Sequence, residues 1–409
     1  MNCRFCHTPL TDIFIDLGNA PASNSFLSPA QVLEPELYLP LKVFVCPSCF
    51  LVQTADYKRP DTIFNDMYVY FSSYSKSWLQ HAQRYVESMT ARFGLNSSSH
   101  VVEVASNDGY LLQYFQQKGI PVLGIDPTSN TAQVAIDKGI ATVIDFFGVR
   151  LARELAAKGE RADLLVGNNV LAHVPDISDF VGGMKILLKR DGVITMEFPH
   201  LMRLIESNQF DTIYHEHFSY LSLSAVRQVF ESQGLELFDV EELPTHGGSL
   251  RMFAKHREDA AKPVSEQVDA LLRREAEAGM GTLAYYCGFQ RRALEAKLDL
   301  IAFLVEQKRA GKTVAAYGAA AKGNTLLNYC GIKNDLIACV ADANPYKQGN
   351  LLPGSHIPVV DEASLRALRP DFVIIFPWNI QDEITRQLQD FRTWGCRFVI
   401  PIPNLHIVD

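Results

Sequence analysis

The sequence predicts an α/β protein in which two open, mostly parallel sheets follow a small cysteine-rich module. Two Cys-x-x-Cys pairs lie near the N-terminus, and apolar strand-length runs then alternate with helical segments over two separate stretches. Each stretch opens with a strand that leads through a turn of small residues into a helix. We therefore predict a module over 1–60, a central domain over 61–258, linking helices over 259–310 and a C-terminal α/β domain over 311–409.

The N-terminal module carries Cys3-x-x-Cys6 and Cys46-x-x-Cys49. Each pair places two thiolates on one tight turn, and two such turns can close a tetrahedral zinc site. Four unrelated cysteines are the alternative, but a doubled pair in a reducing compartment favours metal. Four thiolates leave no open coordination position, so we expect structural zinc, a solvated His7, a small β insertion in the long spacer, and no catalytic metal.

Composition disfavours several classes of function. The 409 residues carry a formal net charge of −8, with Lys and Arg dispersed, whereas nucleic-acid binding needs a basic surface. The N-terminus MNCRFCHTPL has no apolar signal core, and no unbroken apolar run is long enough to span a bilayer. We expect a cytoplasmic protein that binds neither nucleic acid nor membrane, and a monomer is consistent with so much internal core.

The central domain is predicted to begin with a helix in FSSYSKSWLQHAQRYVESMTARF, where Trp78, Ala82 and Tyr85 share one face. Strands and helices then alternate, with apolar runs in HVVEV, PVLGID, ATVIDFF, ADLLVGN and DGVITMEFP and helical segments in SNTAQVAIDKG and ISDFVGGMKILLK. A long polar helical stretch from about Pro263 to Lys308 separates this domain from the last one. This linking helix could pack between the two domains and leave a cleft for a two-part ligand.

The first strand of the central domain leads into EVASNDG, which lacks the GxGxxG that admits a pyrophosphate. Glu103 opens this turn, Ser106 lies within it and Gly109 ends it, an arrangement that fits a ligand without phosphates. Asp126 ends the next strand and can accept both hydroxyls of a ribose. Asp145 is placed to contact an adenine edge. These acidic residues suit S-adenosylmethionine, and the alternative is a plain sheet whose loop residues cap helices.

The C-terminal domain has its own strand–turn–helix junction in YGAAAKGN. Gly318 lies in this turn, and the free N–H groups of such a helix start bind anions. Lys322 could add a point charge for a phosphate. Asp342 and Asn344 end the next strand. A diphosphate fits this turn better than a sulfonium does, and the alternative is a helix start made of small residues for close packing.

The stretch DTIYHEHFSYLS concentrates polar and aromatic side chains just after a strand. It is not the HExxH of metalloproteases, and although His215 and His217 would share a face in a strand, no third ligand is evident. In a helical turn, Tyr214 and His217 share a face instead. A histidine base and a phenol donor suit deprotonation beside a carbonyl. Glu216 could orient an imidazole or bind a sugar hydroxyl, and a polar loop with satisfied histidines is the alternative.

Taken together, the chain resembles the sugar C-methyltransferase family of deoxysugar biosynthesis along its whole length. The resemblance lies in CRFC…CPSC, YFSSYSKSW, EVASNDGYLL, NNVLAHVPD, FPH, FDTIYHEHFSYLS, HGGSLR and YGAAAKGN, of which YHEHFSYLS with HGGSLR is the specific part. It implies a Rossmann-like class I methyltransferase domain between a zinc module and a second Rossmann-like domain. It also implies methyl transfer to a ring carbon, typically C3, of a nucleotide-linked 4-keto-6-deoxyhexose through an enolate.

The same resemblance implies roles for individual residues. His217 is the implied base, with Tyr214 and Glu216 beside it and His173 and Tyr68 lining the same cavity. S-adenosylmethionine is implied to contact Glu103, Ser106, Gly109, Asp126, Asp145 and Asn168. The nucleotide-diphosphate-linked sugar is implied to contact Tyr70, His246, Arg251, Gly318, Lys322, Asn324, Asp342 and Asn344.

Several alternatives stay open. Any of Tyr68, Tyr70 and Tyr74 could match the active-site tyrosine of the family. His173 could equally be an ordinary loop residue, and the HGGSLR segment could simply form a tight turn entering a strand. Competing functions are O- or N-methylation of a similar sugar, a zinc-ribbon RNA-modifying enzyme, and a nucleotide-sugar binding protein without catalysis. The acidic balance argues against the second and the dense YHEH cluster against the third.

Overall fold

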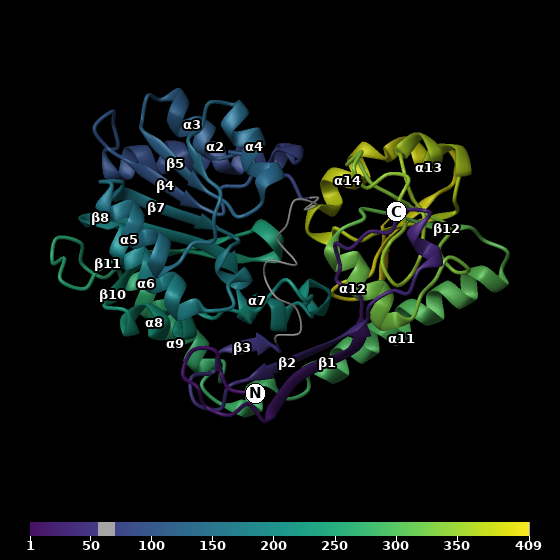
Figure 1. The fold of residues 1–409 in the computed structure, drawn as a ribbon. Coiled ribbons are helices and arrows are strands. Elements are labelled where there is room, and N and C mark those ends of the chain that lie inside the picture. Colours follow the sequence, from purple (N-terminus) through teal and green to yellow (C-terminus); the bar gives the residue numbers. More distant parts are fainter. Residues whose placement is uncertain (56–69, 409) are drawn as a thin grey trace.

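The computed structural model describes residues 1–55 and 70–408, and its strands form three sheets. Two α/β domains lie side by side, and the N-terminal strands run beneath both of them (Figure 1). This arrangement confirms the predicted class, a small N-terminal module followed by two Rossmann-like α/β domains. None of the helices in the described ranges is both long and apolar enough to cross a membrane.

The N-terminal module is built on an antiparallel sheet of order β1-β2-β3-β9. Its own strands are β1 (Asp12–Ala20), β2 (Leu39–Val45) and β3 (Val52–Thr54), with the short helix η1 (Gln31–Leu33) between the first two. The fourth strand, β9 (Ser219–Tyr220), comes from the central domain. The first two strands occupy the spacer between the cysteine pairs, where a β insertion was predicted.

The central domain is entered through η2 (Ser72–Tyr74) and the predicted helix, α2 (Lys76–Phe93). The helix starts where the backbone N–H of Trp78 donates to the hydroxyl of Ser75, at 3.2 Å. It ends at Gly94, whose φ of 62° lies in the left-handed region. Trp78, Ala82 and Tyr85 are buried along one face, as their spacing predicted.

The central sheet has the strand order β10-β11-β8-β7-β4-β5-β6. Strands β4 to β8 run parallel, and β11 lies antiparallel between β8 and β10. Most residues of the parallel strands are buried because helices cover both faces of the sheet. Their carboxyl ends meet along one edge of the sheet, which is where ligands bind in such folds. The strands are β4 (Val101–Val104), β5 (Val122–Ile125), β6 (Thr142–Val143), β7 (Ala162–Asn168), β8 (Leu188–Pro199), β10 (Leu235–Leu243) and β11 (Ser249–His256).

Helices of the central domain connect these strands. They are α3 (Leu112–Gln117), α4 (Ser129–Asp137), α5 (Val149–Ala157), α6 (Ile177–Leu187), α7 (Leu201–Glu206) and α8 (Leu223–Ser232). Three short 3-10 turns complete the domain: η3 (Leu171–His173) after β7, η4 (Phe210–Thr212) after α7 and η5 (Thr245–Gly247) after β10. These three turns and the residues beside them carry many of the polar side chains of the site described below.

The linking segment consists of several helices, in the stretch where linking helices were predicted. It forms α9 (Glu266–Glu277), α10 (Leu283–Tyr286) and α11 (Phe289–Arg309). Gly279 and Gly288 take φ values of 94° and 89°, which a continuous right-handed helix cannot contain. The first helix is held to the central domain by a buried pair in which His200 Nε2 lies 2.8 Å from a Glu275 oxygen.

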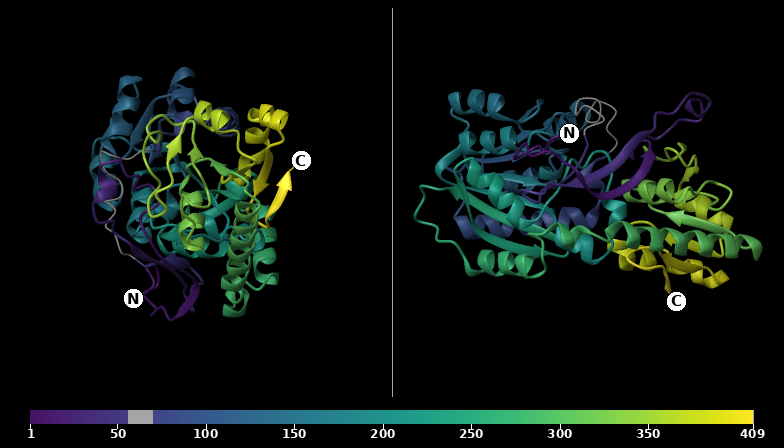
Figure 2. Two further views of the ribbon diagram at one scale, coloured as in Figure 1. Left: turned by 90° about the vertical axis from the view of Figure 1, so that its right-hand side faces the viewer. Right: turned by 90° about the horizontal axis from the view of Figure 1, so that it is seen from below.

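The C-terminal domain contains a six-stranded sheet of order β14-β13-β12-β15-β16-β17, parallel except for its last strand. Figure 2 shows this domain, coloured green to yellow, from two further sides. Its strands are β12 (Val314–Tyr317), β13 (Val340–Ala341), β14 (Val359–Val360), β15 (Phe372–Ile375), β16 (Arg397–Ile400) and β17 (His406–Val408). Its helices are α12 (Ala321–Cys330), α13 (Glu362–Leu368) and α14 (Gln381–Gln387), with η6 (Trp378–Ile380) and η7 (Gln389–Trp394).

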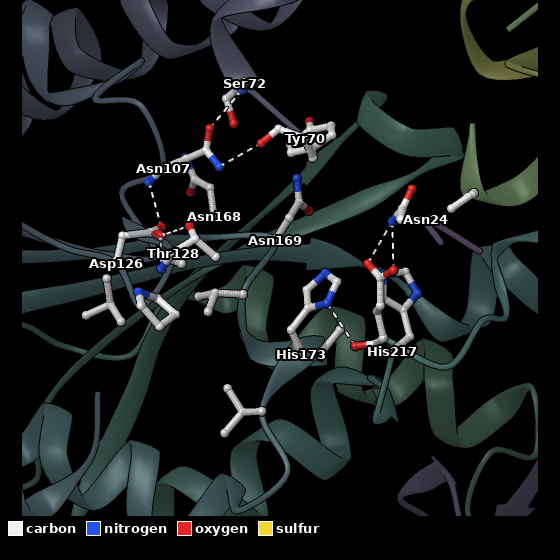
Figure 3. Close-up of a pocket in the computed structure, with 18 of the residues that line it drawn as sticks. Asn24, Tyr70, Ser72, Asn107, Asp126, Thr128, Asn168, Asn169, His173 and His217 are labelled. Carbon is white, nitrogen blue, oxygen red and sulfur yellow. Dashed lines mark hydrogen bonds between the residues drawn. The ribbon is translucent and has the colours of Figure 1, made fainter. Parts of the chain in front are cut away.

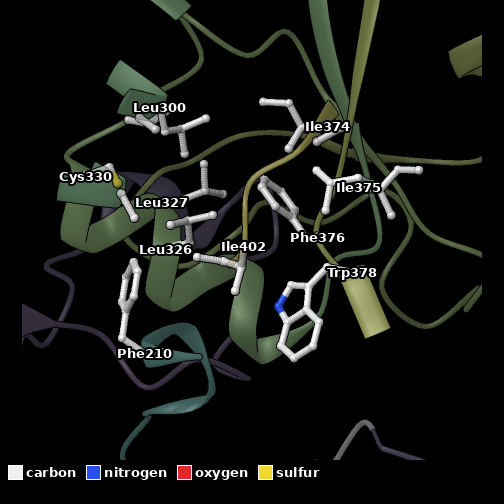
Figure 4. Close-up of a cluster of buried hydrophobic side chains, with 14 of the residues drawn as sticks. Phe210, Leu300, Leu326, Leu327, Cys330, Ile374, Ile375, Phe376, Trp378 and Ile402 are labelled. Atoms are coloured by element: carbon white, nitrogen blue, oxygen red, sulfur yellow. The ribbon is translucent and has the colours of Figure 1, made fainter. Parts of the chain in front are cut away.

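One continuous apolar core joins the domains. Phe210, from the central domain, packs with the buried side chains of the C-terminal domain (Figure 4). Next to it, the indole Nε1–H of Trp378 donates to a carboxylate oxygen of Asp211 at 2.7 Å. On the other side, Phe14 of β1 stacks on Phe289 of α11, with ring centroids 4.6 Å apart. These buried contacts fix the placement of the three parts relative to one another.

Candidate active site

A cavity of about 660 Å³ lies between the central and C-terminal domains. Its walls include the loops at the carboxyl ends of β4, β5 and β7, the turn between η4 and β9, and the start of α12 (Figure 3). This volume is in the range of pockets that hold metabolite-sized ligands. The cavity is therefore the candidate active site, and residues from all three parts of the chain line it.

One side of the cavity is formed by the loop after β4 and by Asp126 after β5. One oxygen of Asp126 accepts the backbone N–H of Asn107 at 2.9 Å, and the other accepts the backbone N–H of Thr128 at 2.9 Å. Burial raises the pKa of this carboxyl, and the hydrogen bonds from Thr128 oppose that rise. The carboxylate thus has a fixed position at the edge of the sheet, as a ribose ligand requires.

The loop between β4 and α3 is strained. Ala105 and Asn107 both adopt left-handed backbone conformations, with φ of 58° and 49°. Such conformations are costly for residues other than glycine and concentrate at ligand sites. The side-chain amide of Asn168 is buried on the same wall, next to the phenol of Tyr110. A buried amide and an acidic residue on one wall fit a polar nucleoside such as that of S-adenosylmethionine.

Two histidines lie together on the opposite wall, His217 from the turn after η4 and His173 from η3. His217 Nδ1–H donates to the carbonyl of Thr212 at 2.9 Å, and His173 Nδ1–H donates to the carbonyl of Glu216 at 2.9 Å. Their rings contact each other edge to face, with centroids 4.6 Å apart. Because a carbonyl can only accept, each ring must carry its proton on Nδ1 when neutral, and Nε2 is then the basic nitrogen.

Burial keeps both imidazoles neutral. Desolvation lowers the pKa of His173 to about 4. Desolvation, together with the neighbouring His173, lowers the pKa of His217 well below its usual range. Tyr214 lies against His217 with ring centroids 3.9 Å apart, and burial raises the pKa of this phenol far above its usual range. His217 and Tyr214 therefore combine a neutral imidazole with a protonated phenol.

His246 approaches the cavity from the turn η5. It has a left-handed φ of 53°, and its Nε2 lies 2.9 Å from the side-chain amide nitrogen of Asn169. Burial lowers the pKa of His246 to about 4. A Cβ on the following Gly247 would come within 2.4 Å of the Trp378 ring, so the glycine is needed for this close approach. The HGG sequence is thus a tight turn that also presents its histidine to the cavity.

The C-terminal domain contributes positive charge. Lys322, in the first turn of α12, lines the cavity, and its ammonium donates to the side-chain oxygen of Asn379 at 2.6 Å. Burial lowers the pKa of Lys322, and the nearby Asp211 opposes this. Lys347 also lines the cavity and donates to the carbonyl of Ala319 at 2.9 Å. Two lysines beside a helix start can balance the charge of a phosphate group.

Most of the sequence-predicted site residues lie on the cavity wall. The structure places Tyr70, Asp126, Asp145, Asn168, His173, Tyr214, Glu216, His217, His246 and Lys322 there. Tyr68 lies outside the described residues, and Tyr74 is exposed away from the wall. The remaining predicted residues are not on the wall, namely Glu103, Ser106, Gly109, Arg251, Gly318, Asn324, Asp342 and Asn344.

The contacts of these remaining residues explain their positions. Arg251 is buried in ion pairs with Glu197 at 2.8 Å and Glu241 at 3.0 Å. Gly109 and Gly318 have φ of 74° and 89°, and a Cβ on either would strike a side chain packed against it. Asp342 accepts the backbone N–H of Ala319 in the turn before α12, at 2.8 Å, and the side chain of Asn324 donates to the carbonyl of Ser23 at 2.6 Å. Asn24, Asn107, Asn169 and Lys347 also line the cavity, although none of them was predicted as a site residue.

The four cysteines of the N-terminal module converge on one point. Cys3 and Cys49 Sγ lie 3.6 Å apart, Cys6 and Cys46 Sγ lie 3.4 Å apart, and all four sulfurs are within 4.8 Å of one another. Sulfurs about 2.3 Å from a tetrahedral zinc ion would be separated by roughly 3.8 Å. The cluster therefore fits one zinc ion closed by four thiolates, as predicted, and His7 is exposed outside it.

The zinc module is directly connected to the active-site turn. Strand β3, which follows the second cysteine pair, pairs with β9 immediately after the YHEHF segment. The Thr54 hydroxyl donates to the carbonyl of His217 at 3.0 Å, and the Thr54 backbone N–H donates to the carbonyl of Phe218 at 3.1 Å. The backbone that carries His217 thus leads directly into β9, the strand that pairs with the sheet of the zinc module.

A mostly parallel α/β sheet with a cavity and an acidic residue at its carboxyl edge is the arrangement of an S-adenosylmethionine-dependent methyltransferase. Family models match a zinc binding domain over residues 3–64, a methyltransferase domain over 78–240 and a C-methyltransferase C-terminal domain over 244–403. C-methyltransferase NovU of Streptomyces niveus is 35% identical over 407 residues, covering 99% of this chain and 96% of the relative. The chain belongs to this C-methyltransferase family.

Other similarities are shorter. A ubiquinone biosynthesis O-methyltransferase of Bartonella quintana (strain Toulouse) is 29% identical over 97 residues, which are 23% of this chain and 38% of that protein. The crystal structure of magnesium protoporphyrin IX methyltransferase from Synechocystis PCC 6803 with bound S-adenosylmethionine covers 44% of this chain and 79% of its own, at 16% identity and a TM-score of 0.34. The family assignment rests on the relative that spans the whole chain.

Proposed function

We propose that the protein transfers the methyl group of S-adenosylmethionine to C3 of a nucleotide-linked 4-keto-6-deoxyhexose, in deoxysugar or branched-sugar biosynthesis. The observation that supports this most is the pair His217 and Tyr214 on the wall of a cavity that also contains Asp126 and Lys322. A C–H bond reacts with a methyl sulfonium only after a neighbouring ketone has acidified it. A base beside a phenol suits that activation.

The reaction proceeds by way of an enolate. Nε2 of His217 removes the C3 proton. The C–H electron pair then forms a C3–C4 double bond, and the ketone oxygen at C4 becomes the enolate oxygen. The Tyr214 phenol donates a hydrogen bond to that oxygen, where negative charge develops. When bound, S-adenosylmethionine would supply an electrophilic methyl group, and the electron pair of its S–CH3 bond would stay on sulfur as a neutral thioether. The electron pair of the enolate forms the new bond at C3, which restores the ketone. Glu216 and His173 border the same space and hold the sugar.

The two ends of the ligand are held by different domains. The loops around Asp126 hold the adenosyl group, and Lys322, Lys347 and the start of α12 hold the diphosphate of the nucleotide. Binding energy from the distant nucleotide is then used to place C3 beside the base. Gly318, Asn324, Asp342 and Asn344 shape the turn that presents these groups rather than contacting the sugar.

Mass spectrometry in deuterated buffer tests the proposed function. The protein is mixed with a panel of nucleotide-linked 4-keto-6-deoxyhexoses, with and without S-adenosylmethionine. We expect a gain of one methyl group with the donor, and deuterium at the ring carbon beside the ketone without it. Methylation of a sugar that lacks a ketone, without exchange, would overturn the enolate route and establish an O- or N-methyltransferase instead.

The pH dependence of methyl transfer provides a second test. The base must be neutral to accept a proton, and the pKa of His173 is lowered to about 4 while that of His217 is lowered well below its usual range. As the pH falls, we therefore expect kcat/KM to be maintained through pH 6 and to decline only below about 5. Circular dichroism at each pH checks that the protein stays folded. An acid limb centred near 6.5 would contradict this assignment of the base.

A further inference from the structure

Asn24 lies on the cavity wall although it belongs to the N-terminal module. Its side-chain amide nitrogen donates to both carboxylate oxygens of Glu216, at 2.7 and 2.9 Å (Figure 3). Glu216 itself is buried, at 3% exposure. An ionised carboxylate offers acceptor lone pairs on both oxygens, whereas protonation would turn one oxygen into a donor, so the paired contact favours the ionised form. The contact therefore selects the carboxylate and fixes its direction.

The backbone beside Asn24 is anchored to the C-terminal domain. The side chain of Asn324, on α12, donates to the carbonyl of Ser23 at 2.6 Å in a fully buried bond. A few residues later, Leu27 and Leu351 form an isolated antiparallel bridge. The loop after β1 is thus held by the C-terminal domain while its Asn24 side chain reaches the central domain. Asn24 stands where all three parts of the chain meet.

Glu216 connects this junction to the histidines. Its backbone carbonyl accepts the Nδ1–H of His173 at 2.9 Å, and the next residue is His217. The side chain of Glu216 is held by Asn24, and the backbone after it is held by Thr54 of β3. Two separate contacts from the N-terminal module therefore define the position of a single turn, one through its side chain and one through its backbone.

We infer that Asn24 is a positioning residue of the active site, which holds Glu216 as an ionised carboxylate and thereby fixes the turn that carries His217. The catalytic consequence rests on the proposed function, whereas the contact itself does not. The N-terminal module accordingly does more than bind zinc, because it supplies a side chain to the site. Asn24 acts through Glu216.

An Asn24→Asp variant tests the contact without any substrate. Two carboxylates at hydrogen-bond distance cannot both ionise easily, so the pair would keep one proton well above the usual carboxyl range. A carboxyl pKa that is raised on folding stabilises the protein at low pH, and that stabilisation is lost as the pH rises through the raised value. We expect the Tm of Asn24→Asp to fall relative to wild type between pH 5 and pH 8. A pH-independent difference in Tm would overturn the contact.

Methyl-transfer kinetics test the positioning role. Asn24→Ala is expected to lower kcat on the order of 10²-fold, the size of effect that misplacement of a catalytic group can produce, with the Kd for S-adenosylmethionine unchanged. Asn24→Asp is expected to gain an alkaline limb in its pH profile that wild type lacks. Ser25→Ala, on the exposed neighbouring residue, is the matched control and should behave as wild type. A wild-type kcat in Asn24→Ala would overturn the inference.

Failure of the proposed function would be distinguishable from failure of this inference. If wild type methylates no sugar of the panel, the proposed function is overturned, and the Tm measurements on Asn24→Asp still decide whether Asn24 holds Glu216. If wild type is active and the Tm difference does not depend on pH, the inference alone is overturned.

Discussion

A His217→Asn variant is expected to lose methyl transfer by about 10²- to 10⁴-fold, the range that a general base contributes. Asparagine can still donate a hydrogen bond in place of Nδ1–H, which bonds the Thr212 carbonyl, so the turn should keep its shape. It has no basic nitrogen, however, and proton removal from the sugar would stop. Steady-state kinetics should place the loss in kcat, and deuterium exchange without the methyl donor should fall in parallel.

His215→Asn is the matched control, because it changes the other histidine of the same tripeptide. His215 Nε2 lies 3.3 Å from the carbonyl of Leu39 and 3.2 Å from that of Pro40, on the side of the N-terminal strands. Its replacement should lower Tm and leave the kcat of the folded enzyme near that of wild type. Equal losses of kcat in the two variants would contradict a specific role for His217 as the base.

A Cys49→Ser variant is expected to lose zinc, stability and methyl transfer together. Zinc contributes roughly 10–16 kcal/mol of apparent binding free energy in small four-ligand modules, and a serine hydroxyl is a poor substitute for a thiolate. Cys46 and Cys49 lie on the turn between β2 and β3, and β3 pairs with β9 next to His217. Without the metal, this support for the active-site turn should be lost.

Three measurements separate the consequences of Cys49→Ser. Metal analysis should show the loss of zinc, and hydrogen exchange should increase in the β9 strand. Calorimetry should still detect S-adenosylmethionine binding, because Asp126 is held within the central sheet. Cys287→Ser, at an exposed cysteine outside the cluster, should keep zinc and activity. Full methyl transfer by a zinc-free Cys49→Ser enzyme would refute the proposed link between the metal module and catalysis.

The sequence predicted those site residues whose local chemistry is distinctive. His217 and Tyr214 were singled out by their spacing in one turn, and their rings are in contact in the structure. Lys322 and Asp126 were singled out by their positions after strands, and both line the cavity. By contrast, Asn24 occurs in an ordinary polar loop, and no spacing relates it to Glu216, from which it is separated by 192 positions.

Glycines and charged residues near motifs were less informative about contact with a ligand. Gly109 and Gly318 are required by backbone conformation and close packing, so their presence in a turn does not place them on the cavity wall. Arg251 faces Glu197 across neighbouring strands, and this partner is known only once β11 is seen to lie beside β8. The breaks between the linking helices fall at glycines whose positive φ no periodicity could reveal.

The sequence by itself determined the three-part α/β architecture, the four-cysteine cluster and the histidine–tyrosine turn, because periodicity, cysteine pairing and local spacing depend on residues close together in the chain. Only the tertiary structure decided which side chains line the cavity and that β9 extends the zinc module's sheet up to His217. It also decided that Asn24 reaches Glu216. These contacts depend on how separately formed units pack, and packing selects partners by shape and burial rather than by their distance along the chain.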